Sequence, residues 1–348
     1  MRTHGLIHIS EEFWRMSRKL NVGVLSCANI AVKSILPALK YLNKHFNIIG
    51  IASRSPEKAN KFSDVFDIKP YYDYNEILKY SNLDAIYIPL PNSLHAKWIE
   101  KALDAGVNVL VEKTMTCNHA DTMRLNTKAR NKNLVLMENF QFRFHPQLQS
   151  ILQLINDGEI GELRSVKSTF AFPPFSDPYN IRYSSELGGG ALLDVGAYPL
   201  KILQIFMGHN IDVVAATSHF DTVKNVDLWG SGFVKSADNN VSGSFNFGFD
   251  NYYQCELELI GSVGRIYTDR IFTAPPNYSP SITISKNGLL TKIVTIEPSN
   301  HFVNALLHFK NQILDGQKLS DEYSQNINQS RLISQFRSAV KLTSQKVF

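Results

Sequence analysis

The sequence predicts an α/β protein with two domains: a doubly wound N-terminal domain and a C-terminal α+β domain built on a largely antiparallel open sheet. The chain has 348 residues, which is enough for two domains of ordinary size. Up to about residue 138, short apolar strands alternate with longer helices, a pattern typical of a parallel sheet covered on both faces. Beyond it, strands follow one another with few helices between them, which favours antiparallel pairing.

The first domain is expected over residues 20–138, after an N-terminal extension of residues 1–19. Its strands are nearly continuous apolar runs, which indicates a sheet buried on both sides. Pro56 stands in the first turn of one predicted helix, and Gly106 ends another. The predicted strands cover 21–25, 46–52, 85–88, 107–111 and 134–138. The predicted helices cover 30–45, 56–66, 74–80, 93–105 and 120–131.

The second domain is expected over residues 139–348, with tail helices in 302–348. Phe245, Phe247 and Phe249 alternate with polar residues, so we expect one face of this sheet to be covered. The predicted strands cover 165–172, 211–221, 227–234, 241–249, 252–260, 264–269 and 281–285. The predicted helices cover 191–206, 302–314 and 331–345.

Composition excludes several classes of protein. The chain is 44% hydrophobic and 19% charged, which excludes an intrinsically disordered chain. Its net charge of +5 comes without a long basic run, so we expect no nucleic-acid partner. The most apolar stretch, 191–207, contains Asp194 and Lys201, so we expect no membrane span.

Three cysteines, Cys27, Cys117 and Cys255, form no CxxC pair. We therefore expect no disulfide framework, no metal site and a reducing, cytoplasmic location. Glu11, Glu12 and Arg15 interrupt any apolar run near the N-terminus, which excludes a signal peptide there. We expect residues 1–15 to be an extension from an alternative start.

The first strand–helix junction lies where a doubly wound sheet binds a dinucleotide. Such sites use glycines to bring the backbone close to a pyrophosphate at a helix N-terminus. Here Ser26 and Ala28 stand at the usual glycine positions, so the motif on its own is incomplete and its place in the sheet supports it. The residues expected to contact a cofactor are Ser26, Cys27, Ala28, Asn29 and Ile30.

The second strand ends in Ser53-Arg54-Ser55, with Lys58 one turn further on. An NAD site usually has a carboxylate here for the ribose 2′-hydroxyl, whereas Arg54 can clamp a 2′-phosphate through paired hydrogen bonds. A solvated basic loop is the alternative interpretation. With the strand placement, we expect NADP(H) rather than NAD(H), bound in part by these four residues.

Two further strands deliver polar residues to the same edge of the sheet. The residues expected at the cofactor are Pro89, Leu90, Pro91, Asn92, His95, Glu112 and Lys113. Taken separately, Glu112 and Lys113 suit a surface ion pair, and His95 suits a structural cap. A third segment, Gly188-Gly189-Gly190, lets the backbone approach a ligand closely. Asp194 and Tyr198 follow it at helical spacing, so one helix face presents both.

Together these motifs resemble the Gfo/Idh/MocA family of nicotinamide-dependent oxidoreductases, from about Lys19 to the C-terminus. The chain has Glu112-Lys113, with Thr114 where the family usually has proline, and the glycine triplet followed by Asp194, Gly196 and Tyr198. The resemblance implies an NAD(P)-binding Rossmann domain and a C-terminal domain for substrate and oligomerisation. It also implies a homodimer or homotetramer formed through the open sheet.

The run from Phe172 to Pro199 is similar to the sugar-nucleotide 3-ketoreductases of deoxysugar biosynthesis. Those enzymes use NADPH to reduce a C-3 ketone on a dTDP-linked 2,6-dideoxyhexose. The resemblance implies that Tyr198 donates the proton and that Lys113 polarises the ketone and lowers the Tyr198 pKa. Asp194 is expected to orient Lys113 or a sugar hydroxyl.

The residues expected to face the substrate are Arg143, His145, Arg182 and Tyr183. For Arg143 and His145, packing at the domain junction is the equal alternative. Two other functions stay open. One is a dehydrogenase of free sugars or diols, and the other is a cofactor-binding regulatory protein without catalysis.

Overall fold

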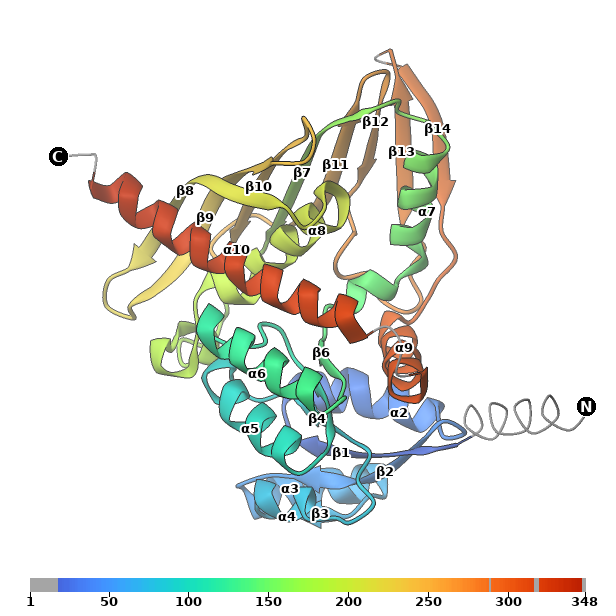
Figure 1. Ribbon diagram of the computed structural model, residues 1–348, viewed down its shortest axis with the longest axis vertical. Helices are drawn as coiled ribbons and strands as arrows, with labels where there is room; N and C mark the ends of the chain where they lie inside the picture. Colours follow the sequence, from blue (N-terminus) through green and yellow to red (C-terminus); the bar gives the residue numbers. More distant parts are fainter. Residues whose placement is uncertain (1–17, 288, 316–318, 346–348) are drawn as a thin grey trace, which may run out of the picture.

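The computed structural model describes residues 18–287, 289–315 and 319–345, so nearly all of the predicted extension 1–19 lies outside the described residues. Two sheets lie at opposite ends of the molecule, and the long helix α10 (Leu319–Gln345) crosses the junction between them (Figure 1).

The first sheet has the strand order β3-β2-β1-β4-β5-β6, and all of its pairs are parallel. This is the predicted doubly wound arrangement, in which the strand order reverses between β1 and β4. Its strands are β1 (Leu20–Leu25), β2 (Phe46–Ala52), β3 (Pro70–Tyr71), β4 (Ala85–Ile88), β5 (Asn108–Val111) and β6 (Leu136–Glu138).

Helices cover both faces of this sheet. One face packs on α4 (Tyr74–Leu78), α5 (Asn92–Asp104) and α6 (His119–Asn131). The other packs on the helical segment that follows β1, on α3 (Pro56–Phe66) and on α9 (His301–Asp315). The segment after β1 begins with a π-helical stretch, Ala31–Ile35, and continues as α2 (Leu36–Tyr41).

The second sheet has the order β14-β13-β12-β11-β7-β10-β9-β8, and its pairs are antiparallel except β7 with β10. This confirms the predicted α+β domain with a largely antiparallel sheet. Its strands are β7 (Leu163–Ala171), β8 (Ile211–Asp221), β9 (Val226–Ser236), β10 (Ser242–Gly248), β11 (Gln254–Gly261), β12 (Gly264–Thr268), β13 (Ser281–Lys286) and β14 (Leu289–Thr295).

The inner face of this sheet packs on α7 (Pro146–Asn156), α8 (Ala197–Met207) and α10. The predicted aromatic alternation is confirmed, because Phe245, Phe247 and Phe249 are all buried. Phe336 of α10 packs against the first two, with ring centroids 5.6 and 5.4 Å away. The sheet therefore has one covered face, as the pattern predicts.

The tail helices differ from the predicted division of the chain. Residues 302–348 were assigned to the second domain, but Leu306 and Phe309 of α9 are buried in the core of the first. Tyr323, near the start of α10, packs into the first domain as well, while Phe336 lies in the second. The tail thus binds the two domains together instead of belonging to one.

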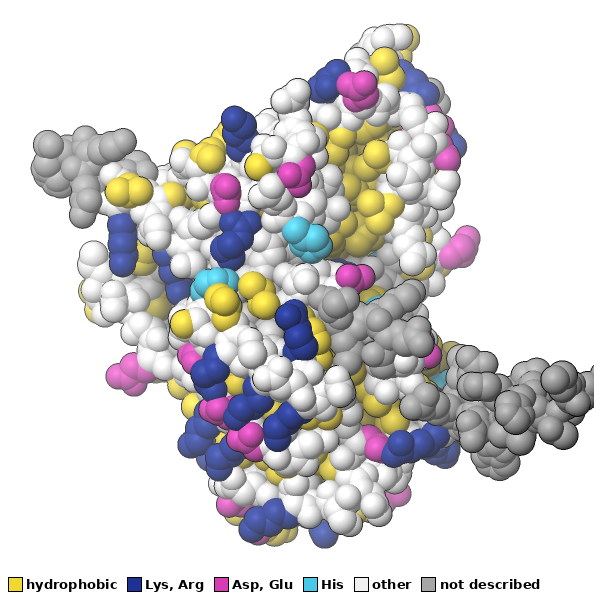
Figure 2. All heavy atoms as spheres, viewed as in Figure 1, with side chains coloured by type: hydrophobic (Ala, Val, Ile, Leu, Met, Phe, Trp, Pro, Cys, Tyr) yellow, Lys and Arg dark blue, Asp and Glu magenta, His cyan; other side chains and the backbone are white. Residues whose placement is uncertain are grey.

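Surface charge is mixed on the face shown in Figure 2, where acidic side chains lie among the basic side chains over α5 and α6. Glu100 of α5 pairs with both Arg124 and Lys128 of α6. Within the part of the chain that the structure describes, no helix is both long and apolar enough to cross a membrane.

Ser26 has a backbone φ of +126°, in the region that favours glycine. Replacing Ser26 by glycine relieves this strain, and the relief exceeds the entropy that glycine adds to the unfolded chain. We expect Ser26→Gly to raise the free energy of unfolding by about 0.5–1 kcal/mol in urea denaturation. The control is Ala28→Gly, at a position without positive φ, which should destabilise the protein. Equal effects of both changes would contradict this account.

Candidate active site

A cavity of about 700 Å³ lies between the two domains, at the carboxyl edge of the parallel sheet. The first domain contributes the turn after β1 and the segments after β4 and β5. The second contributes the end of β7, the glycine segment and the start of α8. Among the predicted site residues, the cavity is lined by Cys27, Ala28, Asn29, Ile30, Lys58, Pro89, Leu90, Pro91, Asn92, Glu112, Lys113, Arg182, Asp194 and Tyr198.

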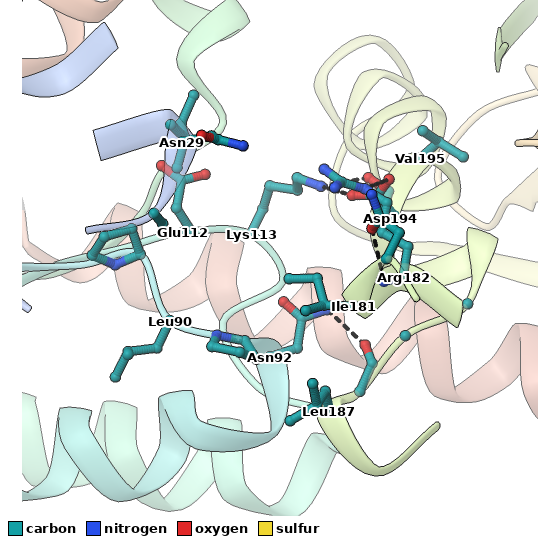
Figure 3. A pocket seen from close by; sticks show the side chains of 18 of the residues that line it. Asn29, Leu90, Asn92, Glu112, Lys113, Ile181, Arg182, Leu187, Asp194 and Val195 are labelled. Atoms are coloured by element: carbon teal, nitrogen blue, oxygen red, sulfur yellow. Dashed lines mark hydrogen bonds and ion pairs between the residues drawn. The ribbon is translucent and has the colours of Figure 1, made fainter. Parts of the chain in front are cut away.

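Lys113, Asp194 and Arg182 form an ion-pair chain across this cavity (Figure 3). Lys113 Nζ lies 2.8 Å from Asp194 Oδ1 and donates a second hydrogen bond of 2.6 Å to the Asp194 carbonyl oxygen. Arg182 Nε donates to Asp194 Oδ2 at 2.6 Å. Burial alone would raise the pKa of Asp194, but Lys113 and Arg182 lower it to about 2. Two cations therefore share one carboxylate, and Lys113 is held with its ammonium group beside the Tyr198 ring.

Tyr198 lies in the first turn of α8, with its ring packed edge-on against Phe140 and Phe170 at centroid distances of 5.4 and 5.1 Å. Lys113 Nζ is 5.1 Å from the centre of the same ring. Burial raises the pKa of Tyr198 above its usual value, and Lys113 opposes this only in part. The expectation of a lowered pKa is therefore wrong, because desolvation in the aromatic surroundings outweighs the charge of Lys113.

Gln141 also lines the cavity and was not predicted. Its side chain hydrogen-bonds to Tyr198, which favours the ionised form of the phenol. Gln141 follows β6, and β6 is the strand next to β5 at the same edge of the sheet. The reasoning that identified the residues after β4 and β5 would have found Gln141 if it had been extended by one strand.

The glycine segment is required by close packing. A Cβ on Gly190 would clash with Asp227 Oδ1, and Gly190 has a φ of +102°. Asp227, which arrives from β9, accepts a hydrogen bond of 2.5 Å from the Leu192 backbone N–H. Asn92 donates to the Gly188 carbonyl oxygen at 2.9 Å, which ties the segment to the first domain. These contacts hold the helix that carries Asp194 and Tyr198.

At the end of β2, the serines support the loop and do not line the cavity. Ser53 Oγ accepts from the Ser55 N–H at 3.1 Å, and Ser55 Oγ accepts from the Lys58 N–H at 3.3 Å, where it caps α3. Arg54 is exposed beside them, with its guanidinium against the Tyr74 hydroxyl. Ser26, Ser53, Arg54 and Ser55 are thus outside the cavity lining, although Cys27 and Lys58 are part of it.

Glu112 lines the cavity and is held there by hydrogen bonds from two residues of neighbouring strands and segments. Its Oε1 accepts hydrogen bonds from Tyr87 Oη and Asn139 Nδ2, each at 2.7 Å. His95 was predicted at the cofactor but is fully buried outside the cavity lining. Its ring nitrogens lie 2.8 Å from the Thr114 carbonyl oxygen and 2.7 Å from that of Leu90, and burial lowers its pKa to about 4. His95 therefore braces two loops that line the cavity, which corrects the prediction of a direct contact.

Arg143, His145 and Tyr183 also lie outside the cavity lining, contrary to prediction. Arg143 pairs with Glu322 of α10 at 2.7 Å, and His145 Nδ1 caps α7 by accepting from the Gln147 N–H. These two residues follow the alternative of junction packing, because each has a buried polar partner away from the cavity. The Tyr183 hydroxyl accepts from the Phe175 N–H at 3.1 Å, and its ring packs in an aromatic cluster.

Two family descriptions match the chain. The oxidoreductase family with an NAD-binding Rossmann fold, GFO/IDH/MocA, matches residues 20–140, and the GFO/IDH/MocA C-terminal domain matches residues 148–267.

Individual relatives agree with these family matches. A dTDP-3,4-didehydro-2,6-dideoxy-α-D-glucose 3-reductase of Saccharopolyspora spinosa is 38% identical, covering 88% of this chain and 91% of that protein. A D-xylose 1-dehydrogenase (NADP⁺) of Haloferax volcanii is 30% identical, covering 89% of this chain and 94% of that protein. The structure of a 3-ketoreductase from Actinomadura kijaniata in complex with NADP and TDP-benzene has a TM-score of 0.88 at 33% identity, covering 92% of this chain and 98% of that one.

Asp194→Asn tests the shared carboxylate. The change leaves Lys113 and Arg182 without a counter-charge, so we expect a loss of roughly 3 kcal/mol of unfolding free energy at pH 7. The parent's Asp194 pKa of about 2 lies below its unfolded value of about 3.9, so the stabilisation is present above pH 4 and is lost as the pH falls to 2. The difference in unfolding free energy between parent and variant, measured by urea denaturation, should therefore become smaller as the pH falls from 4 to 2. A difference that stays constant over that range would be inconsistent with this ion pair.

Proposed function

We propose that this chain, which belongs to the GFO/IDH/MocA family of oxidoreductases, uses NADPH to reduce the C-3 keto group of a nucleotide-linked 2,6-dideoxyhexose. The observation that carries the proposal is the convergence of Lys113, Asp194 and Tyr198, from two domains, on one cavity. The 3-reductase and 3-ketoreductase relatives support this substrate class.

The cavity suits NADP(H). Residues 27–30 line it where the helical segment after β1 begins, and the N–H groups of a helix N-terminus favour phosphate. Arg54 follows the end of β2, where an NAD site would have a carboxylate, and Lys58 lies in the first turn of α3. Residues 27–30 would hold the pyrophosphate. Arg54 and Lys58 would hold the 2′-phosphate. When bound, the nicotinamide supplies the hydride for the reduction.

Tyr198 supplies the proton. Its hydroxyl donates to the ketone oxygen as that oxygen gains negative charge, giving the alcohol and a tyrosinate. Lys113 and Gln141 stabilise this tyrosinate, because both lower the pKa of Tyr198. Asp194 holds Lys113 in place through its carboxylate and its carbonyl oxygen. An ordinary phenol pKa of about 10 already keeps a tyrosine protonated at neutral pH, and burial raises the pKa of Tyr198 further.

A dehydrogenase of free sugars is the second candidate, and the xylose dehydrogenase relative favours it. A regulatory protein without catalysis has less support, because Lys113, Asp194 and Tyr198 meet in one cavity. The deciding experiment is an NADPH-oxidation screen against keto-sugar nucleotides, run in parallel with NADP⁺ reduction by free sugars and diols. Turnover restricted to free sugars or diols would overturn the proposed substrate class.

Arg54→Ala tests the cofactor preference. Losing a charge-assisted contact to the 2′-phosphate should weaken NADPH binding by roughly 1.5–3 kcal/mol and leave NADH binding nearly unchanged. Fluorescence titration with both cofactors measures the two affinities. Lys40→Ala, on the exposed side of α2, is a control of the same charge change. Equal affinities of the parent protein for NADPH and NADH would sink this assignment.

Tyr198→Phe tests the proton donor. Without the hydroxyl, kcat should fall by something like 10²–10⁴, the range for losing a general acid, while NADPH affinity and thermal stability are kept. Lys113→Ala should lower kcat too, and can also weaken cofactor binding because Lys113 follows β5. Parental kcat in Tyr198→Phe across the pH range, on a verified substrate, would mean that another group supplies the proton.

The open face of the second sheet supports a homodimer or homotetramer. Val214, Trp229 and Phe233 on β8 and β9 are each more than a third exposed there, and a second copy would cover them. Light scattering at micromolar concentration should give a multiple of the chain mass. A monomeric mass would overturn this expectation, and Phe233→Lys should shift the multiple towards the monomer.

A further inference from the structure

Four charged side chains meet at the domain junction, outside the cavity lining, and the mechanism above uses none of them. They come from β6, from the turn after it, from α8 and from α10, the elements that converge between the two sheets (Figure 1). Glu138, Lys201 and Glu322 are at most 3% exposed, and the side chain of Arg143 is 11% exposed. The group comprises Glu138, Arg143, Lys201 and Glu322. Arg143 and Glu322 form an ion pair of 2.7 Å, and Glu138 and Lys201 are the other two members of the group.

Glu138 is tied to the segment that carries Lys113. It is the last residue of β6, and its Oε1 accepts a hydrogen bond of 2.7 Å from the Met115 backbone N–H, two residues beyond Lys113. Its other oxygen, Oε2, is buried and has no hydrogen-bond partner among the described residues. A buried carboxylate with a spare oxygen depends on a nearby cation. Glu138 therefore holds the backbone two residues beyond Lys113.

Lys201 is tied to the helix that carries Tyr198. It lies three residues after Tyr198 in α8, is fully buried, and donates from Nζ to Gln204 Oε1 at 3.1 Å. Nζ also lies 5.5 Å from the ring centre of Phe140. That same ring packs edge-on against Tyr198 at 5.4 Å. Lys201 therefore supports Tyr198 both through the helix and through the Phe140 ring.

The charges of Glu138 and Lys201 attract each other within this buried setting. Burial raises the pKa of Glu138, and Lys201 is the leading opposing influence. Burial lowers the pKa of Lys201, with Arg143 adding to the effect and Glu138 opposing it. The other titratable groups that act on the pair are Glu322 and, on Lys201, His209 beyond α8, while His308 of α9 faces Glu322.

We propose that Glu138 and Lys201 are positioning residues whose buried attraction sets Lys113 of the first domain against Tyr198 of the second. The inference rests on the proposed function for the roles of Lys113 and Tyr198. Apolar residues of similar volume would fill the same space at little cost in stability. Apolar residues would not favour one placement over another. A pair of opposite charges favours one placement of the Lys113 segment relative to the Tyr198 helix, which a proton-transfer site requires.

The test is a double-mutant cycle of Glu138→Gln and Lys201→Met. The amide oxygen that Glu138→Gln introduces can still accept from the Met115 N–H, so this change removes the charge and keeps the hydrogen bond. Each single variant should lower kcat about tenfold with the KM for NADPH within about twofold, and the double variant should recover to within about threefold of the parent. The control cycle is Glu100→Gln with Lys128→Met, a partly exposed surface pair between α5 and α6 at 2.9 Å, which should leave kcat unchanged. Parental kcat in both single variants, or a double variant as slow as the product of the singles, overturns the proposal.

The melting temperatures of the two single variants should depend on pH in opposite directions. In Glu138→Gln the pKa of Lys201 lies below its unfolded value, so the folded state binds fewer protons and the melting temperature should rise with pH. In Lys201→Met the pKa of Glu138 lies above its unfolded value, so the melting temperature should fall as the pH rises above about 4. The double variant should follow the parent. At a fixed pH, changes in melting temperature that are additive over the cycle would mean that the charges do not interact.

A structural measurement separates this inference from the proposed function. Crystal structures of the parent and the three variants with NADP give the distance from Lys113 Nζ to the Tyr198 ring centre, 5.1 Å in the parent. It should change by about 0.5 Å or more in the single variants and return in the double variant. This measurement needs no substrate, so a parent that reduces no keto-sugar nucleotide refutes the proposed function alone. A distance that is the same in all four proteins refutes the positioning role.

Discussion

The carboxylate of Asp194 is the interaction on which the site depends, because it binds cations from both sides of the cavity. Lys113 reaches it from the end of β5, and Arg182 reaches it from the loop that precedes the glycine segment. Without this carboxylate, two cations would face each other in a partly buried space, and Lys113 would have no fixed place near Tyr198. Each larger feature of the fold can be understood as support for this contact.

That support comes from both ends of the cavity. The parallel sheet delivers Lys113 to its carboxyl edge, beside the point where the strand order reverses, which is where doubly wound sheets bind ligands. The second domain delivers Asp194 on a helix whose start is held by Asp227 of β9. Helix α10 joins the domains: Tyr323 donates to the Leu134 carbonyl oxygen at 2.6 Å, and Gln329 donates to that of Ala197 at 2.8 Å. The second contact ends one residue before Tyr198, so the tail helix contributes directly to the placement of the site.

Much of this could be predicted because periodicity and strand ends are local properties of a sequence. The predicted strands 46–52, 85–88 and 211–221 agree with β2, β4 and β8 to the residue. Partners distant in sequence could not be predicted in the same way. Arg143 was expected at the substrate because nothing near it in the chain shows that Glu322, 179 positions away, takes its charge. Helix α7 is a different case, because it is absent from the expected elements although its sequence predicts it. Leu148, Ile151 and Leu154 have helical spacing, and all three are buried.

The acidity of Tyr198 shows why burial has to be known before charge can be interpreted. A lysine beside a phenol favours ionisation, and the sequence alone supports only that half of the argument. The structure adds the desolvation by Phe140, Phe170 and the surrounding core, which raises the pKa more than Lys113 lowers it. The desolvated phenol resists ionisation even with a lysine beside it, so an argument from charge alone gives the wrong sign for the shift. Lys113 and Gln141 limit the size of the shift, because each favours the ionised phenol. The sign of a pKa shift at a buried site therefore depends on how completely the fold removes water from the group, which its neighbours in the sequence do not reveal.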